Sequence, residues 1–265
     1  MHTVLTIAGS DSIGGAGIQA DLKTMCAHHV YGMSAVTALT AQNTLGVKSI
    51  MNVTPEFLSD EIDMVFEDIP PDAVKIGMTS APELISVIAE RLSFYGARHI
   101  VTDPVMISST GRKLLSDEAK LSMTEKLLPL SELITPNIPE ASELVSREIC
   151  DRSDMERAAA DLSDMFQTSV LLKGGHLEGK CDDVLFLRNG GLFWFENKRI
   201  DNPNTHGTGC TLSSAIACNL AMGYGIIESV KNAKAYVTGA IEAGLDIGHG
   251  SGPMDHAFSI QKNEY

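Results

Sequence analysis

The residues best suited to chemistry form the run THGTGCTLSSAIACNLAMG, which begins at Thr205. Gly207 and Gly209 permit a tight or left-handed turn, and Thr208 offers a hydroxyl group immediately before an apolar helical pattern. A turn of this kind directs several free backbone N–H groups at one point, with the positive end of the helix dipole behind them. The sequence therefore predicts an anion-binding turn over residues 205–211, called the anion turn below.

Cys210 falls in the first helical turn of this run, where the same field is expected to lower the pKa of its thiol. Three interpretations compete: a structural cysteine, a covalent nucleophile, or a residue beside a phosphoryl group in transfer. A cysteine hydrolase needs a histidine that a third group orients. His206 is near in sequence, but no residue that would orient it is evident. Phosphoryl transfer is therefore favoured.

A second glycine-rich run, GSDSIGGAGIQAD, begins at Gly9 and follows the apolar stretch TVLTIA. Gly15, Gly17 and Ala20 match the G-x-G-x-x-G/A spacing of dinucleotide sites, whose first glycine ends the strand directly. Here five residues separate Gly9 from Gly15, and no Asp or Glu occurs over 22–55 to bind a ribose. No Gly-Lys pair is followed by Ser or Thr, which excludes a P-loop. The run is either a plain strand-to-helix turn or, as its four glycines favour, a loop that a ligand approaches closely.

Composition narrows the class of protein. The 265 residues are 44% hydrophobic, which suits one large core and a single domain over 1–265. The formal net charge is −14 and the 20 basic residues form no patch, so nucleic-acid binding is not expected. No apolar run is long enough for a membrane span and no secretion signal is evident, so we expect a cytoplasmic protein with no membrane contact. The five cysteines form no C-x-x-C pair, so buried, reduced thiols are expected rather than disulfides or zinc ligands.

Short β-rich runs alternate with helical patterns along the chain. The predicted strands are TVLTIA, SAVTALTAQ, DAVKIG, HIVTD, SELIT, SVLLK, DDVLFL and GLFWFE. The predicted helices cover 16–29, 56–67, 82–95, a segment from about 139, 154–166, 210–223 and 227–246. This alternation predicts a three-layer, doubly wound α/β fold, with a mostly parallel central sheet and helices on both faces.

Ligands of such sheets bind outside the carboxyl ends of the strands, and in this chain polar or glycine-rich residues follow six predicted strands. They are the run from Gly9, then Gln42 with Asn43, Gly77 with Met78, Asp103 with Pro104, TPNIPE with Asn137 and Glu140, and KGGH from Lys173. The six strand ends are expected to form one cleft.

Taken together, AGSDSIGGAGIQADLKT, TALTAQNT, VKIGM, DPVM, TPNIPE, LLKGGH and HGTGCT resemble the hydroxymethylpyrimidine and phosphomethylpyrimidine kinases of thiamin biosynthesis. These belong to the ribokinase-like superfamily, and the resemblance runs in order from about residue 5 to about residue 258. It implies ATP- and Mg²⁺-dependent phosphorylation of 4-amino-5-hydroxymethyl-2-methylpyrimidine (hydroxymethylpyrimidine below), then of its monophosphate, by a homodimer. Ile13 departs from the family pattern, which has a third consecutive glycine at this position.

The resemblance also implies roles at the phosphate side. The N–H groups of Gly207, Thr208, Gly209 and Cys210 would hold the phosphoryl group in transfer. Cys210 stands where the superfamily's sugar kinases carry an aspartate base, and would accept or relay the hydroxymethyl proton. Lys173 would contact the phosphates as a point charge; alternatively, it is a solvated lysine at a strand end.

The N-x-x-E spacing of Asn137 and Glu140 matches the superfamily element that acts on Mg²⁺ and its waters. Ordinary capping residues of a helix would give the same spacing. Asp103 would serve the metal and the nucleotide, with Asn137, Lys173 and Thr208 as further nucleotide contacts. Asp103 could also merely cap the segment that follows it.

For the substrate, Gln42 carries a donor and an acceptor on one amide and can pair with the aminopyrimidine edge, although an ordinary polar residue at a strand end is equally compatible. By resemblance, Asp21 contacts the hydroxymethyl side, Met78 supplies an adaptable apolar wall, and Gly9 and Val105 complete the pocket. Two other functions stay open: a pyridoxal kinase of the same superfamily, and a ligand-binding regulator without turnover. The complete set of phosphoryl-transfer residues argues against the regulator.

Overall fold

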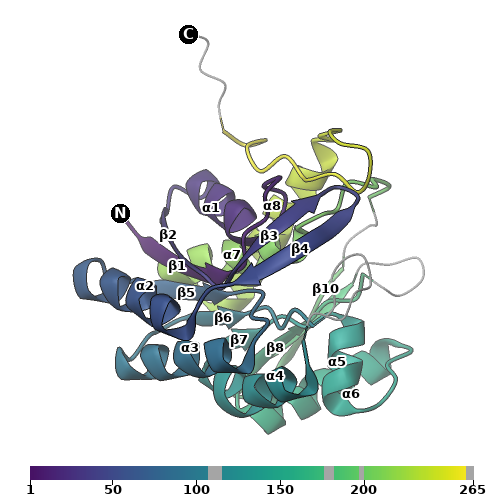
Figure 1. Ribbon diagram of the computed structural model, residues 1–265. Coiled ribbons are helices and arrows are strands. Elements are labelled where there is room, and N and C mark those ends of the chain that lie inside the picture. The colour runs from purple at the N-terminus through teal and green to yellow at the C-terminus, as the bar shows by residue number, and fades with distance from the viewer. Residues whose placement is uncertain (107–114, 176–181, 197–199, 261–265) are drawn as a thin grey trace.

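The structure is a computed structural model that describes residues 1–106, 115–175, 182–196 and 200–260. The strands of its central sheet are β1 (Thr3–Ala8), β2 (Tyr31–Val36), β5 (Ala73–Ile76), β6 (Ile100–Thr102), β7 (Leu133–Ile134), β8 (Ser169–Leu172), β9 (Asp183–Phe186) and β10 (Leu192–Phe195). Their order across the sheet is β10-β9-β8-β7-β6-β5-β1-β2 (Figure 1).

Among the described strands of the central sheet, the pairs β2-β1, β1-β5, β5-β6, β6-β7 and β7-β8 are parallel, whereas β8-β9 and β9-β10 are antiparallel. The central strands β5 and β8 are buried at every position, as expected for parallel strands that are covered on both faces. The predicted class, a doubly wound and mostly parallel α/β fold, is confirmed.

Helices cover both faces of the sheet (Figure 1). They are α1 (Gly17–Ala27), α2 (Pro55–Asp68), α3 (Pro82–Phe94), α4 (Asp117–Ser122), α5 (Ile138–Val145), α6 (Arg152–Phe166), α7 (Thr208–Ala221) and α8 (Ile226–Glu242). Successive strand residues point to opposite faces. Leu5 and Ile7 of β1 pack in one core cluster with α2, α3 and α6, whereas Val4 packs in the other cluster with α7 and α8. The sheet thus separates two apolar cores.

Helix α7 fixes the position of the anion turn. Every residue from Thr211 to Ala221 is buried, and the small side chains of Ser213, Ser214 and Ala215 allow close packing against the sheet. A helix enclosed in this way cannot shift its first turn independently of the sheet. Its N-terminus is therefore held at the carboxyl edge of the parallel strands.

The predicted strand SAVTALTAQ is wrong in one respect, because the structure divides it at Thr37. The Thr37 N–H bonds to the carbonyl oxygen of Ala8 and its hydroxyl donates to the carbonyl oxygen of Met78, which turns the chain out of the sheet. The second half, β3 (Ala38–Asn43), pairs with β4 (Gly46–Asn52) in a separate antiparallel ribbon (Figure 1). β4 was not predicted, because its lysine, serine and exposed positions do not form a clear strand pattern.

The segment after Leu115 was not predicted either. It contains α4, a π-helical turn at Met123–Leu127 and a 3₁₀ turn at Leu128–Leu130, which are too short and irregular for a periodicity signal. His176, the last residue of the run KGGH, and Cys181 lie outside the described residues. Within the described ranges, no helix combines the length and apolar character that crossing a membrane requires.

The expectation of buried thiols holds only in part. The four described cysteines are free, but Cys26 and Cys150 are exposed, Cys210 is half-buried and only Cys218 is fully enclosed. Cys26 lies near the end of an amphipathic helix and Cys150 in a loop, where a cysteine costs nothing to expose. The number and spacing of the cysteines therefore do not predict which thiols are buried.

Candidate active site

One cavity of about 960 Å³ lies at the carboxyl ends of the parallel strands, as predicted. Its wall contains all but one of the site residues predicted from the sequence: Gly9, Gln42, Met78, Asp103, Val105, Asn137, Glu140, Lys173, Gly207, Thr208, Gly209 and Cys210. These residues come from seven separate segments of the chain, so the fold brings them together.

The anion turn has the backbone geometry that its glycines predicted. Gly207 is the N-cap of α7, with φ of +85°, and a Cβ there would overlap the carbonyl oxygen of Gly15. The first helical backbone bond runs from the Thr211 N–H to the Gly207 carbonyl, so the N–H groups of Gly209 and Cys210 precede the helical ladder. Gly209 and Cys210 both line the cavity, at the positive end of the helix dipole. This turn is suited to an anion.

Gly209 differs from Gly207, because it lies inside α7 and its φ is not in the left-handed region. A Cβ built on Gly209 would lie 3.1 Å from Oδ2 of Asp103 and 3.5 Å from Nζ of Lys173. The absence of a side chain at Gly209 therefore leaves space between the anion turn and the Asp103–Lys173 pair, and the left-handed geometry that the sequence permitted at both glycines occurs at Gly207 and not at Gly209.

Lys173 and Asp103 form a largely buried ion pair opposite the anion turn. The Lys173 Nζ lies 2.8 Å from Oδ1 of Asp103, and the Thr135 hydroxyl donates to the same oxygen at 3.1 Å. Burial alone would lower the pKa of Lys173, but the carboxylates of Asp103 and Glu140 outweigh it and raise the pKa above its ordinary value. Lys173 therefore carries a positive charge at the cavity wall rather than in bulk solvent.

Asn137 and Glu140 cap α5 and line the cavity at the same time. The Asn137 side chain accepts from the Glu140 N–H at 2.8 Å, and the Glu140 carboxylate accepts from the Asn137 N–H at 2.9 Å. The capping interpretation of this spacing is thus correct, and it does not compete with a place in the cavity. Burial, assisted by the charge of Asp103, raises the pKa of Glu140 to about 7, although Lys173 opposes the shift.

A divalent cation fits this part of the cavity. Within the described residues, no three His, Cys, Asp or Glu side chains form a metal-binding group. Mg²⁺, however, is commonly held by one or two carboxylates together with substrate phosphates. Glu140 is 2% exposed and lacks enough nearby positive charge to stay fully ionised at neutral pH. A cation would supply that charge.

Asp21 is the predicted site residue that the structure does not bring to the cavity. Its side chain is fully buried and accepts from Lys75 at 2.8 and 2.9 Å, from Ser214 at 2.7 Å and from Thr6 at 2.6 Å. The predicted contact with the hydroxymethyl group is therefore wrong, because protein donors surround this carboxylate. Asp21 instead links α1 to α7 and the sheet.

The expected lowering of the Cys210 pKa is also wrong. Burial is the largest influence and raises the pKa of the thiol, and the charges of Asp21 and Asp103 act in the same direction. The ammonium of Lys75 opposes them without reversing the result. Cys210 is therefore a neutral thiol in the free protein.

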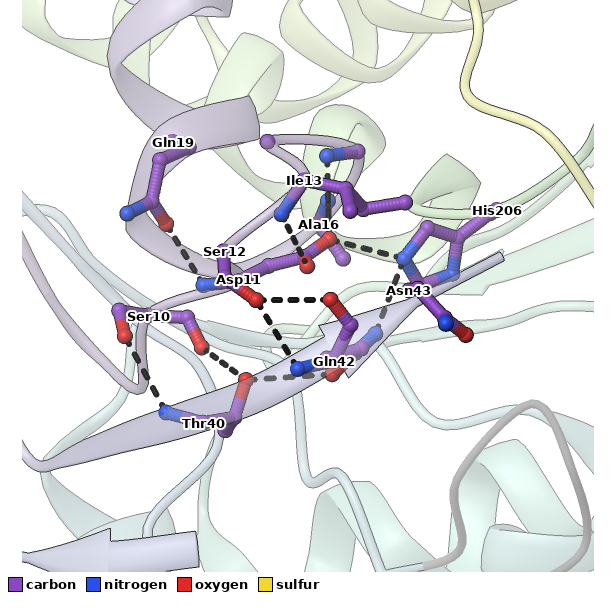
Figure 2. Close-up of polar contacts among 12 residues, drawn as sticks. Ser10, Asp11, Ser12, Ile13, Ala16, Gln19, Thr40, Gln42, Asn43 and His206 are labelled. Carbon is purple, nitrogen blue, oxygen red and sulfur yellow. Dashed lines mark hydrogen bonds and ion pairs between the residues drawn. The ribbon is translucent and has the colours of Figure 1, made fainter. Parts of the chain in front are cut away.

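Sequence reasoning missed the contact between Asp11 and His206, and it gave neither residue a role in the site. The His206 Nε2 lies 2.9 Å from Oδ2 of Asp11 and 3.1 Å from Nε2 of Gln42 (Figure 2). Asp11 is thus the orienting group for His206 that the sequence did not reveal. The 195-residue separation of the two hides the contact, although the position of each beside a glycine-rich turn was a usable signal.

The cavity continues beyond the anion turn along one face of α8, which the sequence did not indicate. The lining there includes Lys234, Val237, Thr238 and Ile241 of α8 together with Ile200, Asn202 and Pro203, and the Asn202 amide donates to the Ile241 carbonyl at 2.8 Å. Lys234 forms an ion pair with Asp183, and Asp183 also accepts from the Gly174 N–H at 2.8 Å. The cavity therefore has room on both sides of the anion turn.

Comparison with known proteins identifies the family. The family model described as phosphomethylpyrimidine kinase matches residues 11–255. A hydroxymethylpyrimidine/phosphomethylpyrimidine kinase of Rhizobium meliloti is 48% identical over 95% of this chain and 96% of its own length. The chain belongs to the phosphomethylpyrimidine kinase family. The predictions of this family and of a phosphotransferase are confirmed.

Solved structures of this family and of its neighbours share the fold. A phosphomethylpyrimidine kinase of Clostridium difficile is 48% identical with a TM-score of 0.82, over 91% of this chain and 100% of its own. A Bacillus subtilis pyridoxal kinase with ADP is 35% identical with a TM-score of 0.89, over 97% and 98% of the two chains. The chain spans only 53% of a bifunctional thiamine biosynthesis protein of Geobacter sulfurreducens, to which it is 48% identical. The predicted ribokinase-like fold is confirmed.

Proposed function

We propose that the protein transfers the γ-phosphoryl group of ATP to hydroxymethylpyrimidine, and then a second phosphoryl group to the monophosphate, to give the diphosphate. The observation that carries this proposal is that one cavity contains both the amide of Gln42 and the anion turn. An aminopyrimidine presents a ring-nitrogen acceptor beside an amine donor, and a single amide can pair with both. Relatives named for this activity, with up to 48% identity, support the proposal.

The chemistry follows from the charges around the anion turn. Phosphoryl transfer passes through a loose transition state, so the protein contributes mainly position and electrostatic stabilisation. The N–H groups of Gly209 and Cys210 hold the equatorial oxygens as charge spreads over them, and Lys173 adds a positive charge from the opposite wall. Thr208 and Asn137 are proposed as further nucleotide contacts.

Mg²⁺ is proposed as the cofactor, with Glu140 and the Oδ2 atom of Asp103 as its protein oxygens, directly or through water. When bound, it neutralises phosphate charge. Binding of Mg²⁺ also favours the ionised form of Glu140, whose pKa in the free protein is about 7. This explains how the cavity keeps a buried carboxyl group that is costly to ionise without a cation.

Cys210 is proposed to relay the hydroxymethyl proton as the new bond to phosphorus forms: its sulfur takes up the hydroxymethyl hydrogen while the thiol gives its own hydrogen to a non-bridging oxygen of the transferred phosphoryl group or to water. Its thiol is neutral before reaction, since burial raises its pKa, so it provides little base strength. A loose transition state requires little, because the nucleophile is scarcely deprotonated when the leaving group departs. Gly9, Met78 and Val105 are proposed to enclose the pyrimidine ring.

We further propose that the protein works as a single domain, as a homodimer, and in the cytoplasm. The β3–β4 ribbon carries exposed apolar side chains at Leu39, Leu45 and Met51, which a second copy could cover. Static light scattering of the purified protein would test the dimer: a monomeric mass across the micromolar range contradicts it.

The function is tested by incubating the purified protein with ATP, Mg²⁺ and either hydroxymethylpyrimidine or pyridoxal, and weighing the products by mass spectrometry. We expect the pyrimidine mono- and diphosphates to appear in turn. Pyridoxal kinase activity is the second candidate, because solved pyridoxal kinases share this fold with TM-scores up to 0.90. Phosphorylation of pyridoxal alone, or a reaction that stops at the monophosphate with ATP in excess, would refute the proposal.

A further inference from the structure

Gln42, His206 and Asp11 form a polar chain at the substrate side of the cavity, which Figure 2 shows in full. The backbone of Gln42 is fixed by Ser12, whose hydroxyl donates to the Gln42 carbonyl at 2.7 Å and accepts from its N–H at 2.9 Å. The backbone is thereby held, and the side-chain torsions of Gln42, including that of its amide group, set its contacts. Its orientation decides whether the cavity presents an oxygen or a nitrogen at each position.

Asp11 decides where His206 carries its proton. The carboxylate of Asp11 accepts from the N–H groups of Ile13, Gly15 and Ala16, at 3.1, 3.0 and 2.8 Å. Burial would raise the pKa of Asp11, but the hydrogen bond with His206 and the bonds from the Ala16 and Ile13 N–H groups lower it below its ordinary value, so this residue is an ionised acceptor. An unprotonated Nε2 of His206 at 2.9 Å would set two lone pairs against each other. The Nε2 atom therefore carries a hydrogen.

A protonated Nε2 on His206 in turn decides the orientation of Gln42. With the amide nitrogen of Gln42 at 3.1 Å from Nε2, two donors would face each other. The other end of the amide lies 3.4 Å from the Thr40 hydroxyl, whose single hydrogen is used in a 2.8 Å bond to the Ser10 carbonyl. That hydroxyl can accept but not donate again. A half-turn of the amide, which exchanges two groups of nearly equal shape, satisfies both contacts.

We propose that His206, held by Asp11, is a positioning residue for specificity: it fixes the oxygen of the Gln42 amide toward itself and the nitrogen toward Thr40. One lone pair and one N–H of the amide then remain for a ligand. This pair matches an amine beside a ring nitrogen and mismatches a carbonyl beside a ring N–H. The identity of the ring that Gln42 pairs with rests on the proposed function. The proton position on His206 does not, because it follows from the contacts of Asp11 and His206.

The state of His206 is tested directly by ¹⁵N NMR of the histidine rings in the ligand-free protein, with His206→Phe used to assign the resonance. We expect a proton on Nε2, whether or not Nδ1 is also protonated. A ring that is protonated on Nδ1 alone overturns the proposal, irrespective of any activity.

The effect on specificity is tested with hydroxymethylpyrimidine and its 4-oxo analogue, which reverses the donor and acceptor positions. For the wild type we expect kcat/KM to favour the amino compound by at least about a hundredfold, because the oxo compound leaves two buried groups mismatched. In His206→Phe the amide can rotate to suit either ring, so the preference should fall at least tenfold. A structural role for His206 would lower kcat/KM for both compounds and leave their ratio unchanged, which would overturn the proposal.

Two further variants separate the contributions. Gln42→Leu should lose the preference, and adding His206→Phe to it should change the ratio no further, because His206 acts through Gln42. Gln19→Leu is the matched control, since Gln19 accepts from the Asp11 N–H at 2.7 Å but does not line the cavity. It should keep the wild-type ratio, and a collapse of the ratio in this control would overturn the assignment to His206. If the wild type phosphorylates neither pyrimidine, the proposed function fails while the NMR result still decides the state of His206.

Discussion

Gly209→Ala separates catalysis from folding more sharply than any other change in the cavity. The added methyl group would lie 3.1 Å from Oδ2 of Asp103 and 3.5 Å from Nζ of Lys173, with no backbone atom in its way. The residue is helical, so alanine meets no conformational penalty and gains some helix propensity. We expect the free energy of unfolding to stay within about 1 kcal/mol of the wild type.

The same methyl group enters the space between the anion turn and the Asp103–Lys173 pair, so we expect it to crowd a phosphoryl oxygen that approaches the Gly209 N–H. Loss of one preorganised donor to a developing oxyanion typically costs about 2.7–4 kcal/mol, or about a hundredfold to a thousandfold in rate. We therefore expect a stable enzyme with a phosphorylation rate at least a hundredfold below that of the wild type.

The assay is single-turnover phosphorylation of hydroxymethylpyrimidine, paired with urea unfolding of the same preparation. Gly225→Ala is the matched control, because a Cβ there meets nothing within 4 Å and Gly225 lies outside the cavity. A Gly209→Ala enzyme with a rate near that of the wild type would refute the assignment of this N–H group to the reacting phosphoryl group. An unfolded variant would refute the reasoning on stability.

Three other changes test the remaining assignments. Cys210→Ser should keep turnover within about tenfold of the wild type in the same single-turnover assay, because a neutral thiol gives little help in a loose transition state; an inactive, folded variant would make the thiol the principal group. Gln42→Leu should lower kcat/KM for hydroxymethylpyrimidine by about tenfold to a hundredfold, and for pyridoxal by much less; equal losses would mean that Gln42 only shapes the pocket. Glu140→Gln should change how stability depends on pH. Burial raises the Glu140 pKa from 4.5 to about 7, so the wild type takes up a proton on folding between these pH values. Its free energy of unfolding therefore falls as the pH rises from 4.5 to about 7. Urea unfolding without Mg²⁺ should show this loss in the wild type but not in the variant, and parallel pH profiles would contradict it.

The sequence predicted the sheet and the edge at which ligands bind, because both depend on local pattern. A buried parallel strand is an apolar run whatever its neighbours are, and a glycine pair before an apolar helix indicates an anion turn by itself. The division at Thr37 could not be predicted in this way. It depends on bonds to Ala8 and Met78, which only the assembled sheet brings within reach.

The chemistry of individual side chains was harder to predict, because it depends on burial. The sequence predicted a lowered pKa for Cys210 from the helix field, yet burial of the thiol raises the pKa. The sequence also showed His206 without a partner, and the partner proved to be Asp11, in a loop at the other end of the chain. Field direction can be predicted from sequence, whereas desolvation cannot.

Asp21 shows why a conspicuous carboxylate need not touch a ligand. It follows a glycine-rich loop, as substrate-binding acids often do, but α1 turns it inward, where Lys75, Thr6 and Ser214 satisfy it completely. A buried pair of this kind contributes little net stability, although removal of one partner is costly because the other charge is left unpaired. What the pair fixes is position: Ser214 belongs to α7, and the charge of Lys75 is felt at Cys210. The bond from Ser214 to Asp21 thus ties the second turn of α7 to the Asp21–Lys75 pair and the sheet, and we expect the pair to support the position of the anion turn, although both side chains are fully buried.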